Sequence, residues 1–117
     1  MRHFKKGRKL SRERNQRRAL YKSLASSFIM HGRIKTTLAK AKAVAPIIEK
    51  LISKAREKDL ANYRQLLKFL PQKAVKYLVF EVAPKFASQK GGYTRIIKAG
   101  LRKSDAARLA ILELVSK

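Results

Sequence analysis

The chain contains no cysteine, no tryptophan and only seven acidic residues. Without cysteine it can form neither a disulfide nor a thiolate metal site, and it has no thiol nucleophile. The sequence holds no run of 18 apolar residues, so we expect no membrane-spanning helix. Its N-terminus is basic but lacks the apolar stretch of a signal peptide. A mitochondrial presequence is disfavoured because the globular pattern begins near Ser11.

Thirty lysines and arginines give the chain a formal net charge of +23 at pH 7. Like charges at this density repel each other and destabilise a compact state, so a polyanionic partner is expected. Nucleic acid fits best, because each neutralised phosphate releases condensed counterions. An anionic membrane surface is the alternative. Hydrophobic residues make up 45% of the 117 positions, which is enough for one folded domain rather than a disordered basic tail.

The two histidines and the few acids form no recognisable metal or catalytic set. A metal site needs three or four suitably spaced ligands, and His3 has no such neighbour in the sequence. His31 falls at the end of a predicted helix, where a partly positive imidazole suits the helix dipole. The acids are expected to form surface ion pairs rather than the pocketed groups of acid–base catalysis. We therefore expect that the protein is not an enzyme and that it binds no cofactor, no metal and no small-molecule substrate.

Basic residues are densest in the first 18 positions, where Glu13 is the only acid. They are Arg2, Lys5, Lys6, Arg8, Lys9, Arg12, Arg14, Arg17 and Arg18. Residues 1–10 show no apolar periodicity and contain Gly7, so we predict an extended N-terminal arm there. At this density the stretch is expected to contact a polyanion rather than remain a solvated surface.

Apolar spacing and capping residues predict about four helices after the arm. The first would start at an N-cap on Ser11 and end near His31, before Gly32. The second, 39–57, would be capped by Thr37 and either kinked or split by Pro46. The third, 60–70, would be capped by Asp59. The fourth, 71–83, would start at Pro71, end at Pro84 and bury Val75, Leu78, Val79 and Val82.

Alternation predicts two or three short strands. Residues 93–101 and 109–115 should form an antiparallel hairpin around a turn at 102–105, where Asp105 bonds local backbone. Residues 34–38 are a candidate third strand. The expected fold is α+β, with the hairpin packed under the helices in a single domain over 11–117.

The segment Lys90-Gly91-Gly92-Tyr93-Thr94-Arg95 has two interpretations. It lacks the spacing of a P-loop, so nucleotide binding is disfavoured. Glycines permit close backbone approach to phosphate, Tyr93 could stack on an unpaired base, and Arg95 could fork two phosphate oxygens. The alternative is a simple turn into a strand, with Tyr93 in the core and Arg95 in solvent.

Several short motifs resemble bacterial large-subunit ribosomal protein seventeen. They are Met1-Arg2-His3, Lys9-Leu10, Arg17-Arg18-Ala19-Leu20, Ile34-Lys35-Thr36-Thr37-Leu38 with Lys40-Ala41-Lys42, Phe86-Ala87-Ser88, Gly91-Gly92-Tyr93-Thr94-Arg95-Ile96, Lys98-Ala99-Gly100, Arg102, Asp105-Ala106 and Glu113-Leu114-Val115. Each is weak alone, but together they cover nearly the whole chain in order. The middle, about 56–85, matches least sharply.

The resemblance implies a small α/β structural protein, with a helix-rich layer packed on a small mixed sheet. It also implies that the protein is held on large-subunit rRNA in the cytoplasmic ribosome, on the outer face near the peptide exit region. Neighbouring large-subunit proteins would be further partners, with no membrane. Charge and motifs together give the expected RNA-binding residues: Arg2, His3, Lys5, Lys6, Arg8, Lys9, Arg12, Arg14, Arg17, Arg18, Lys35, Thr36, Lys40, Lys42, Lys90, Gly91, Gly92, Tyr93, Thr94, Arg95, Lys98 and Arg102.

Two other functions compete with this one. A DNA-compacting nucleoid protein would share the charge, but no helix-turn-helix spacing or minor-groove β-arm is recognisable. A membrane-surface domain would need a helix with a large exposed apolar face, whereas the apolar stripes here are needed for a core. A comparison of binding to duplex DNA and to folded rRNA, together with flotation on anionic liposomes, would distinguish the three functions.

Overall fold

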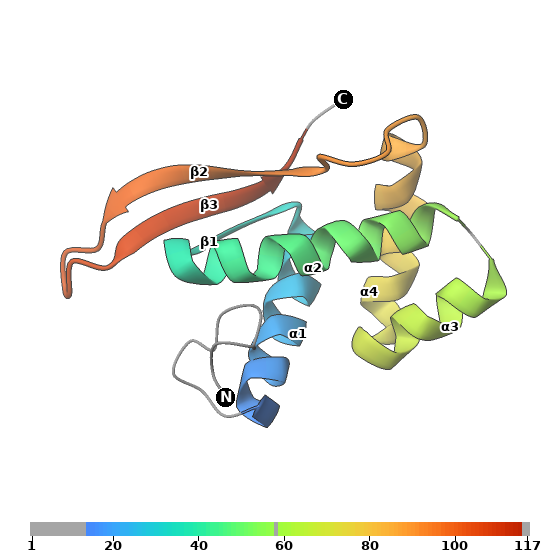
Figure 1. Ribbon diagram of the computed structural model, residues 1–117, viewed down its shortest axis with the longest axis horizontal. Coiled ribbons are helices and arrows are strands. Elements are labelled where there is room, and N and C mark those ends of the chain that lie inside the picture. Colours follow the sequence, from blue (N-terminus) through green and yellow to red (C-terminus); the bar gives the residue numbers. More distant parts are fainter. Residues whose placement is uncertain (1–13, 58, 116–117) are drawn as a thin grey trace, which may run out of the picture.

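The computed structural model describes residues 14–57 and 59–115 (Figure 1). Nine elements follow one another: α1 (Arg14–His31), β1 (Arg33–Thr37), α2 (Leu38–Arg56), α3 (Leu60–Phe69), α4 (Gln72–Tyr77), a π-helical turn η2 (Leu78–Val82), a 3-10 turn η3 (Ala83–Phe86), β2 (Thr94–Leu101) and β3 (Arg108–Leu114). The predicted arm at 1–10 and the predicted N-cap at Ser11 lie outside the described residues.

Capping side chains begin two of the helices, as the sequence predicts. The hydroxyl of Thr37 accepts the backbone N–H of Lys40 at 3.3 Å, which caps α2. The carboxylate of Asp59 accepts the N–H of Asn62 at 2.9 Å, which caps α3. Each cap satisfies a donor that has no intrahelical partner. Gly32 follows α1 at φ 81°, a left-handed conformation that ends a helix at little steric cost in glycine.

Prolines shape the helices only partly as predicted. Of the two outcomes expected for Pro46, a kink or a split, the split does not occur: α2 runs through Pro46 as one helix, whose buried stripe includes Val44 and Ile48 on either side of the proline. Pro71 is the N-cap of α4 rather than its first residue. Pro84 does not stop the fourth helical segment either. The segment first widens into η2 and then tightens into η3, which accommodates a residue without an N–H, and it ends at Phe86.

The three strands form one sheet in the order β1-β3-β2, and both pairs are antiparallel. The α+β class and the predicted hairpin are confirmed, but the sheet is antiparallel throughout rather than mixed. β1 and β2 run in the same direction but are not neighbours, because β3, which the hairpin turns back, lies between them and runs opposite to both. A β-bulge lies between Lys98 and Gly100, where Gly100 has φ 93°.

The helices cover one face of the sheet, and α2 packs against all three strands (Figure 1). Ala110 and Leu112 of β3 point to this side and are fully buried together with Phe28 and Ile48. The predicted inner-face residues Val75, Leu78, Val79 and Val82 are buried as well. Since side chains alternate along a strand, Leu109, Ile111 and Glu113 point to the opposite face. Within 14–57 and 59–115 no helix covers that face.

Candidate nucleic-acid interface

The uncovered face of the sheet carries a row of three charged residues, one from each strand. Arg33 of β1 and Arg95 of β2 both lie directly opposite Glu113 of the middle strand. Glu113 Oε1 lies 3.6 Å from Arg33 Nη2. Glu113 Oε2 accepts a hydrogen bond from Arg95 Nε at 2.8 Å and also contacts Arg95 Nη2. We call Arg33, Glu113 and Arg95 the cross-strand row.

The next position along the same face is aliphatic with one cation. Lys35, Ile111 and Ile97 lie opposite one another across the three strands. Lys35 is exposed, and Ile97 is 41% exposed although it is a large apolar residue. Arg33, Lys35 and Arg95 are therefore presented around an aliphatic centre. The strand residues of this face include no aromatic side chain on which a base could stack.

The hairpin loop carries further cations and one acid, which is already paired. Arg102 donates from Nε and Nη2 to the two carboxylate oxygens of Asp105 at 3.0 and 2.9 Å. Asp105 also accepts the N–H of Ala107 at 3.1 Å, which confirms its predicted role in the turn. These bonds, that from Arg102 above all, lower the pKa of Asp105 from 3.8 to about 2. The same pair raises the pKa of Arg102.

A shallow hollow lies where this hairpin meets the start of α2. Its volume is about 340 Å³, and its lining includes Lys42 and Arg108. Lys42 was predicted to bind RNA, whereas Arg108 and Arg33 were not. The sequence does contain a signal for Arg33, because this residue lies two positions before Lys35 and therefore on the same face of the strand. Arg108 had no clear signal, because the start of β3 becomes evident only from its pairing with Leu101.

Tyr93 lies in the core and not on the surface, which corrects the prediction that it stacks on a base. Its side chain is fully buried, with its ring edge-on to Phe86 at 5.2 Å between centroids. Its hydroxyl accepts from Arg56 Nη1 at 2.9 Å and donates to the carbonyl of Gln89 at 3.2 Å. The alternative interpretation, a turn into a strand with Tyr93 in the core, describes this residue correctly.

The remaining residues of the Lys90–Arg95 segment differ in what they offer a ligand. Lys90, Gly91 and Gly92 are exposed, and Gly92 has φ 65°. Gln89 Nε2 donates to the carbonyls of Gly91 and Gly92 at 2.6 and 2.8 Å, which holds the loop in shape. The Thr94 hydroxyl donates to Glu49 Oε2 at 2.7 Å, so it is used within the fold. The backbone of the glycines and the side chains of Lys90 and Arg95 stay accessible.

The other predicted residues are spread over α1 and the sheet. Arg14 and Arg18 are exposed on the first turns of α1, and Arg17 is partly buried. Lys98 is exposed on β2, whereas Thr36 and Lys40 are half-buried at the junction of β1 and α2. The structure thus places Lys35 and Arg95 on the open face of the sheet and Arg102 in the hairpin, whereas Lys98 pairs with Ala110 and therefore points to the helix side. It does not bring the Arg14–Arg18 stretch into a group with these residues. The arm residues and Arg12 lie outside the described part of the chain.

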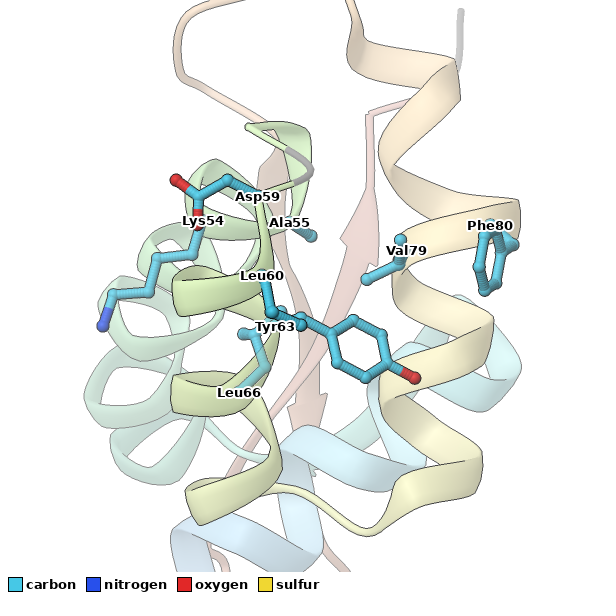
Figure 2. A pocket seen from close by; sticks show the side chains of 8 residues that line it. All are labelled: Lys54, Ala55, Asp59, Leu60, Tyr63, Leu66, Val79 and Phe80. Carbon is cyan, nitrogen blue, oxygen red and sulfur yellow. The ribbon is translucent and has the colours of Figure 1, made fainter.

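A second hollow of about 430 Å³ lies between α2, α3 and η2 (Figure 2). Tyr63 projects from α3 toward the helical turn that carries Val79 and Phe80 (Figure 2). The two charged residues that line the hollow already have partners: Lys54 Nζ donates to Gln65 Oε1 at 2.7 Å, and Asp59 caps α3. The hollow is therefore mainly apolar and lacks the convergent polar groups of a small-molecule site.

Among the described residues, no group of three or more histidines or acids could hold a metal ion. No helix over 14–57 or 59–115 is long and apolar enough to span a bilayer. Asp59 caps α3, Asp105 bonds within the hairpin turn, and Glu113 lies between two arginines. The fold and its surface thus define a class of protein: a small basic α+β domain whose exposed functional groups are cations suited to a polyanion.

Comparison with known proteins identifies the family. The sequence model of ribosomal protein L17 matches residues 20–115. The large ribosomal subunit protein bL17 of Thermomicrobium roseum is 48% identical over 118 aligned residues, which cover 99% of this chain and all of that protein. The bL17 protein of Paramagnetospirillum magneticum is 46% identical over all of this chain and 84% of its own length. That of Clostridium botulinum is 48% identical over 92% of this chain and 96% of its own.

The chain belongs to the ribosomal protein L17 family, as the resemblance in the sequence indicated. It is therefore a ribosomal protein, of a structural rather than an enzymatic class.

Proposed function

We propose that this protein is a structural component of the bacterial large ribosomal subunit, in the cytoplasm, where it binds large-subunit rRNA through phosphate contacts. One observation carries the proposal. The two acids of the open sheet face and its hairpin, Glu113 and Asp105, are both neutralised by arginines. The cations around them therefore leave this surface net positive. Few other cellular partners match such a surface as closely as a phosphate backbone.

The proposed contacts come from three places on the molecule. The sheet and its hairpin contribute Lys35, Arg95, Lys98 and Arg102, and Lys42 of α2 lies beside the hairpin. The helix α1 contributes Arg14, Arg17 and Arg18, and the Lys90–Gly92 loop contributes its cation and its accessible backbone. The arm residues predicted from the sequence would extend the contact beyond the described residues.

The mechanism is binding without turnover. Arginine presents a planar fork that matches two phosphate oxygens, whereas lysine acts as a mobile point charge. Cations on α1 and on the sheet point from different elements, so they can neutralise phosphates of separate RNA segments and hold them together. Neighbouring large-subunit proteins would complete the site, near the peptide exit region.

Binding to purified rRNA at increasing salt tests the electrostatic mechanism. Six to ten phosphate contacts imply a loss of affinity of roughly a thousandfold to a hundred-thousandfold between about 50 and 200 mM salt. Full-length bacterial large-subunit rRNA is the probe, with small-subunit rRNA and duplex DNA as controls. Equal affinity for duplex DNA, or a flat salt response, would contradict the proposal.

The place of the protein on the subunit requires a separate measurement. Purified large subunits carrying a photocrosslinking residue at position 64, exposed on α3, should yield cross-links to rRNA or proteins around the peptide exit. Cross-links confined to the subunit interface side would contradict the proposed location but leave the proposed rRNA binding intact.

A further inference from the structure

In the cross-strand row the acidic side chain is largely buried, whereas the two arginine side chains are exposed to solvent. The side chain of Glu113 is only 16% exposed, whereas those of Arg33 and Arg95 are 62% and 56% exposed. The three residues come from positions 33, 95 and 113, and only the strand pairing brings them together. One carboxylate thus contacts two guanidinium groups on a face that no described helix covers.

Stability alone gives little reason for this arrangement. Exposed ion pairs typically contribute about 0–1 kcal/mol, because solvent and salt screen them. Two arginines beside one acid also leave a net charge of +1 on the row. The positive charge that remains is available to a ligand.

The unused donors of the row point to an anion. A guanidinium has five N–H donors, and Arg95 uses only Nε and Nη2 on Glu113. Arg33 Nη2 approaches Glu113 at 3.6 Å, which is too long for a hydrogen bond. Among the described residues, the other N–H groups of both arginines find no acceptor. Two guanidinium groups with donors to spare can bind the oxygens of one phosphate.

The neighbouring side chains specify which kind of phosphate fits. Lys35 adds a third cation one step along the sheet, and Ile97 and Ile111 give an aliphatic surface beside it. Aliphatic carbon packs against ribose, while the absence of aromatic side chains on these strands excludes stacking of unpaired bases. The surface therefore suits the sugar–phosphate backbone of folded RNA.

We propose that Glu113 is a positioning residue that holds Arg33 and Arg95 as a paired phosphate site for the RNA backbone. This inference rests on the proposed binding of large-subunit rRNA and assigns to it a specific site. Glu113 fixes the Arg95 guanidinium by its bond to Nε and attracts the Arg33 guanidinium, 3.6 Å away, toward the same carboxylate. The arginines therefore lose less side-chain entropy when the phosphate binds.

Glu113→Gln gives a test in which the two explanations predict opposite signs. The substitution keeps the side-chain shape and raises the net charge by one. If only total charge matters, affinity for large-subunit rRNA rises. If Glu113 positions the arginines, affinity falls, and we expect a loss of about threefold to tenfold at moderate salt. The matched control is Glu81→Gln on η2, exposed and outside the row, which adds the same charge and should leave binding unchanged or tighter.

A double-mutant cycle separates positioning from a general effect on β3. In the Arg33→Gln/Arg95→Gln background, Glu113→Gln should cause no further loss of affinity. A loss that persists in that background would mean that Glu113 acts on the fold, and it would overturn the inference. Thermal melting of each free variant shows whether the domain remains folded. Arg64→Gln, an exposed cation on α3, controls for the removal of charge.

The outcomes also distinguish this site from the function it rests on. If Arg33→Gln and Arg95→Gln bind like Arg64→Gln while the wild-type protein keeps its steep salt dependence, the paired site is wrong and the proposed function stands. If Glu113→Gln tightens binding as much as Glu81→Gln, the positioning role is wrong. If wild-type protein shows no salt-dependent preference for large-subunit rRNA, both proposals fail.

Discussion

The carboxylate of Glu49, on α2, accepts the backbone N–H of Thr94, the first residue of β2, at 2.8 Å. The same side chain accepts the Thr94 hydroxyl at 2.7 Å and the N–H of Tyr93 at 3.2 Å. One acid from the helix layer therefore satisfies three donors where the chain enters the sheet. It fixes the position at which β2 begins, and with it the position of Arg95 opposite Glu113.

Glu49→Gln should destabilise the free protein. The amide has no charge and offers only one acceptor oxygen, so at least one of the three half-buried donors loses its partner. Hydrogen bonds to a charged group contribute about 1.5–3 kcal/mol, and we expect a fall of that order in the free energy of unfolding. Urea denaturation monitored by circular dichroism measures it. Glu81→Gln is the control, and an equal effect of both substitutions would contradict the role of Glu49.

Tyr93 should matter for folding and not for RNA binding. Tyr93→Phe removes the hydroxyl that contacts Arg56 and Gln89, and it should lower the free energy of unfolding by about 1–3 kcal/mol. Tyr93→Ala removes the buried ring and should cost about 3–5 kcal/mol. The affinity of Tyr93→Phe for large-subunit rRNA should equal that of the wild type at a temperature where both are folded. A loss of affinity with unchanged melting would restore a role in binding.

The elements that the sequence predicted well depend on local signals. Thr37 and Asp59 cap their helices because the bond that each makes spans only three residues. The hairpin follows from alternation on both sides of a turn, and Asp105 in that turn bonds to a residue two positions later. The family motifs were recognisable for a similar reason, since each is a short string of residues.

The features that the sequence did not predict depend on contacts between distant segments. The segment Gly-Gly-Tyr-Thr-Arg has the same sequence whether its tyrosine faces the solvent or the core. Tyr93 is in the core because it packs against Phe86 and hydrogen-bonds to Arg56, and neither residue belongs to the segment. Glu113 looked like one more surface acid, because its partner Arg33 is 80 positions away and only the strand register joins them. The sequence left open whether Pro46 kinks or splits α2. The helix stays in one piece, because packing of the buried stripe along both halves outweighs the lost hydrogen bond.

The Arg102–Asp105 pair should have a measurable pH signature. Because the folded pKa of Asp105 is lowered to about 2, its stabilising contribution is complete above the ordinary pKa near 3.8 and is lost as the pH falls through about 2. A ¹³C titration of the Asp105 carboxyl carbon should show a midpoint near 2. In Arg102→Gln the midpoint should move up toward the ordinary value, because the largest cause of the shift is removed.

The same substitution should have little effect at neutral pH. Arg102 and Asp105 are exposed, so solvent screens their attraction, and the melting temperature of Arg102→Gln should stay close to that of the wild type. An Asp105 midpoint that stays near 2 in the variant would show that backbone hydrogen bonds, and not the guanidinium, cause the shift.

Deletion of residues 1–10 should separate binding from folding. The segment carries Arg2, Lys5, Lys6, Arg8 and Lys9 without apolar periodicity. Every buried core residue within the described part of the chain lies at or beyond Ala25. We therefore expect the truncated protein to melt like the full chain but to bind large-subunit rRNA more weakly. If all five cations contact phosphates, the slope of log affinity against log salt should become shallower by about four, since each contact contributes slightly less than one.

A replacement of the five cations by glutamine in the full-length chain is the matched control for the loss of chain length, and it should give the same change of slope. A sharp drop in the melting temperature of the truncated protein would instead place the segment in the fold, and an unchanged slope would remove it from the RNA contact.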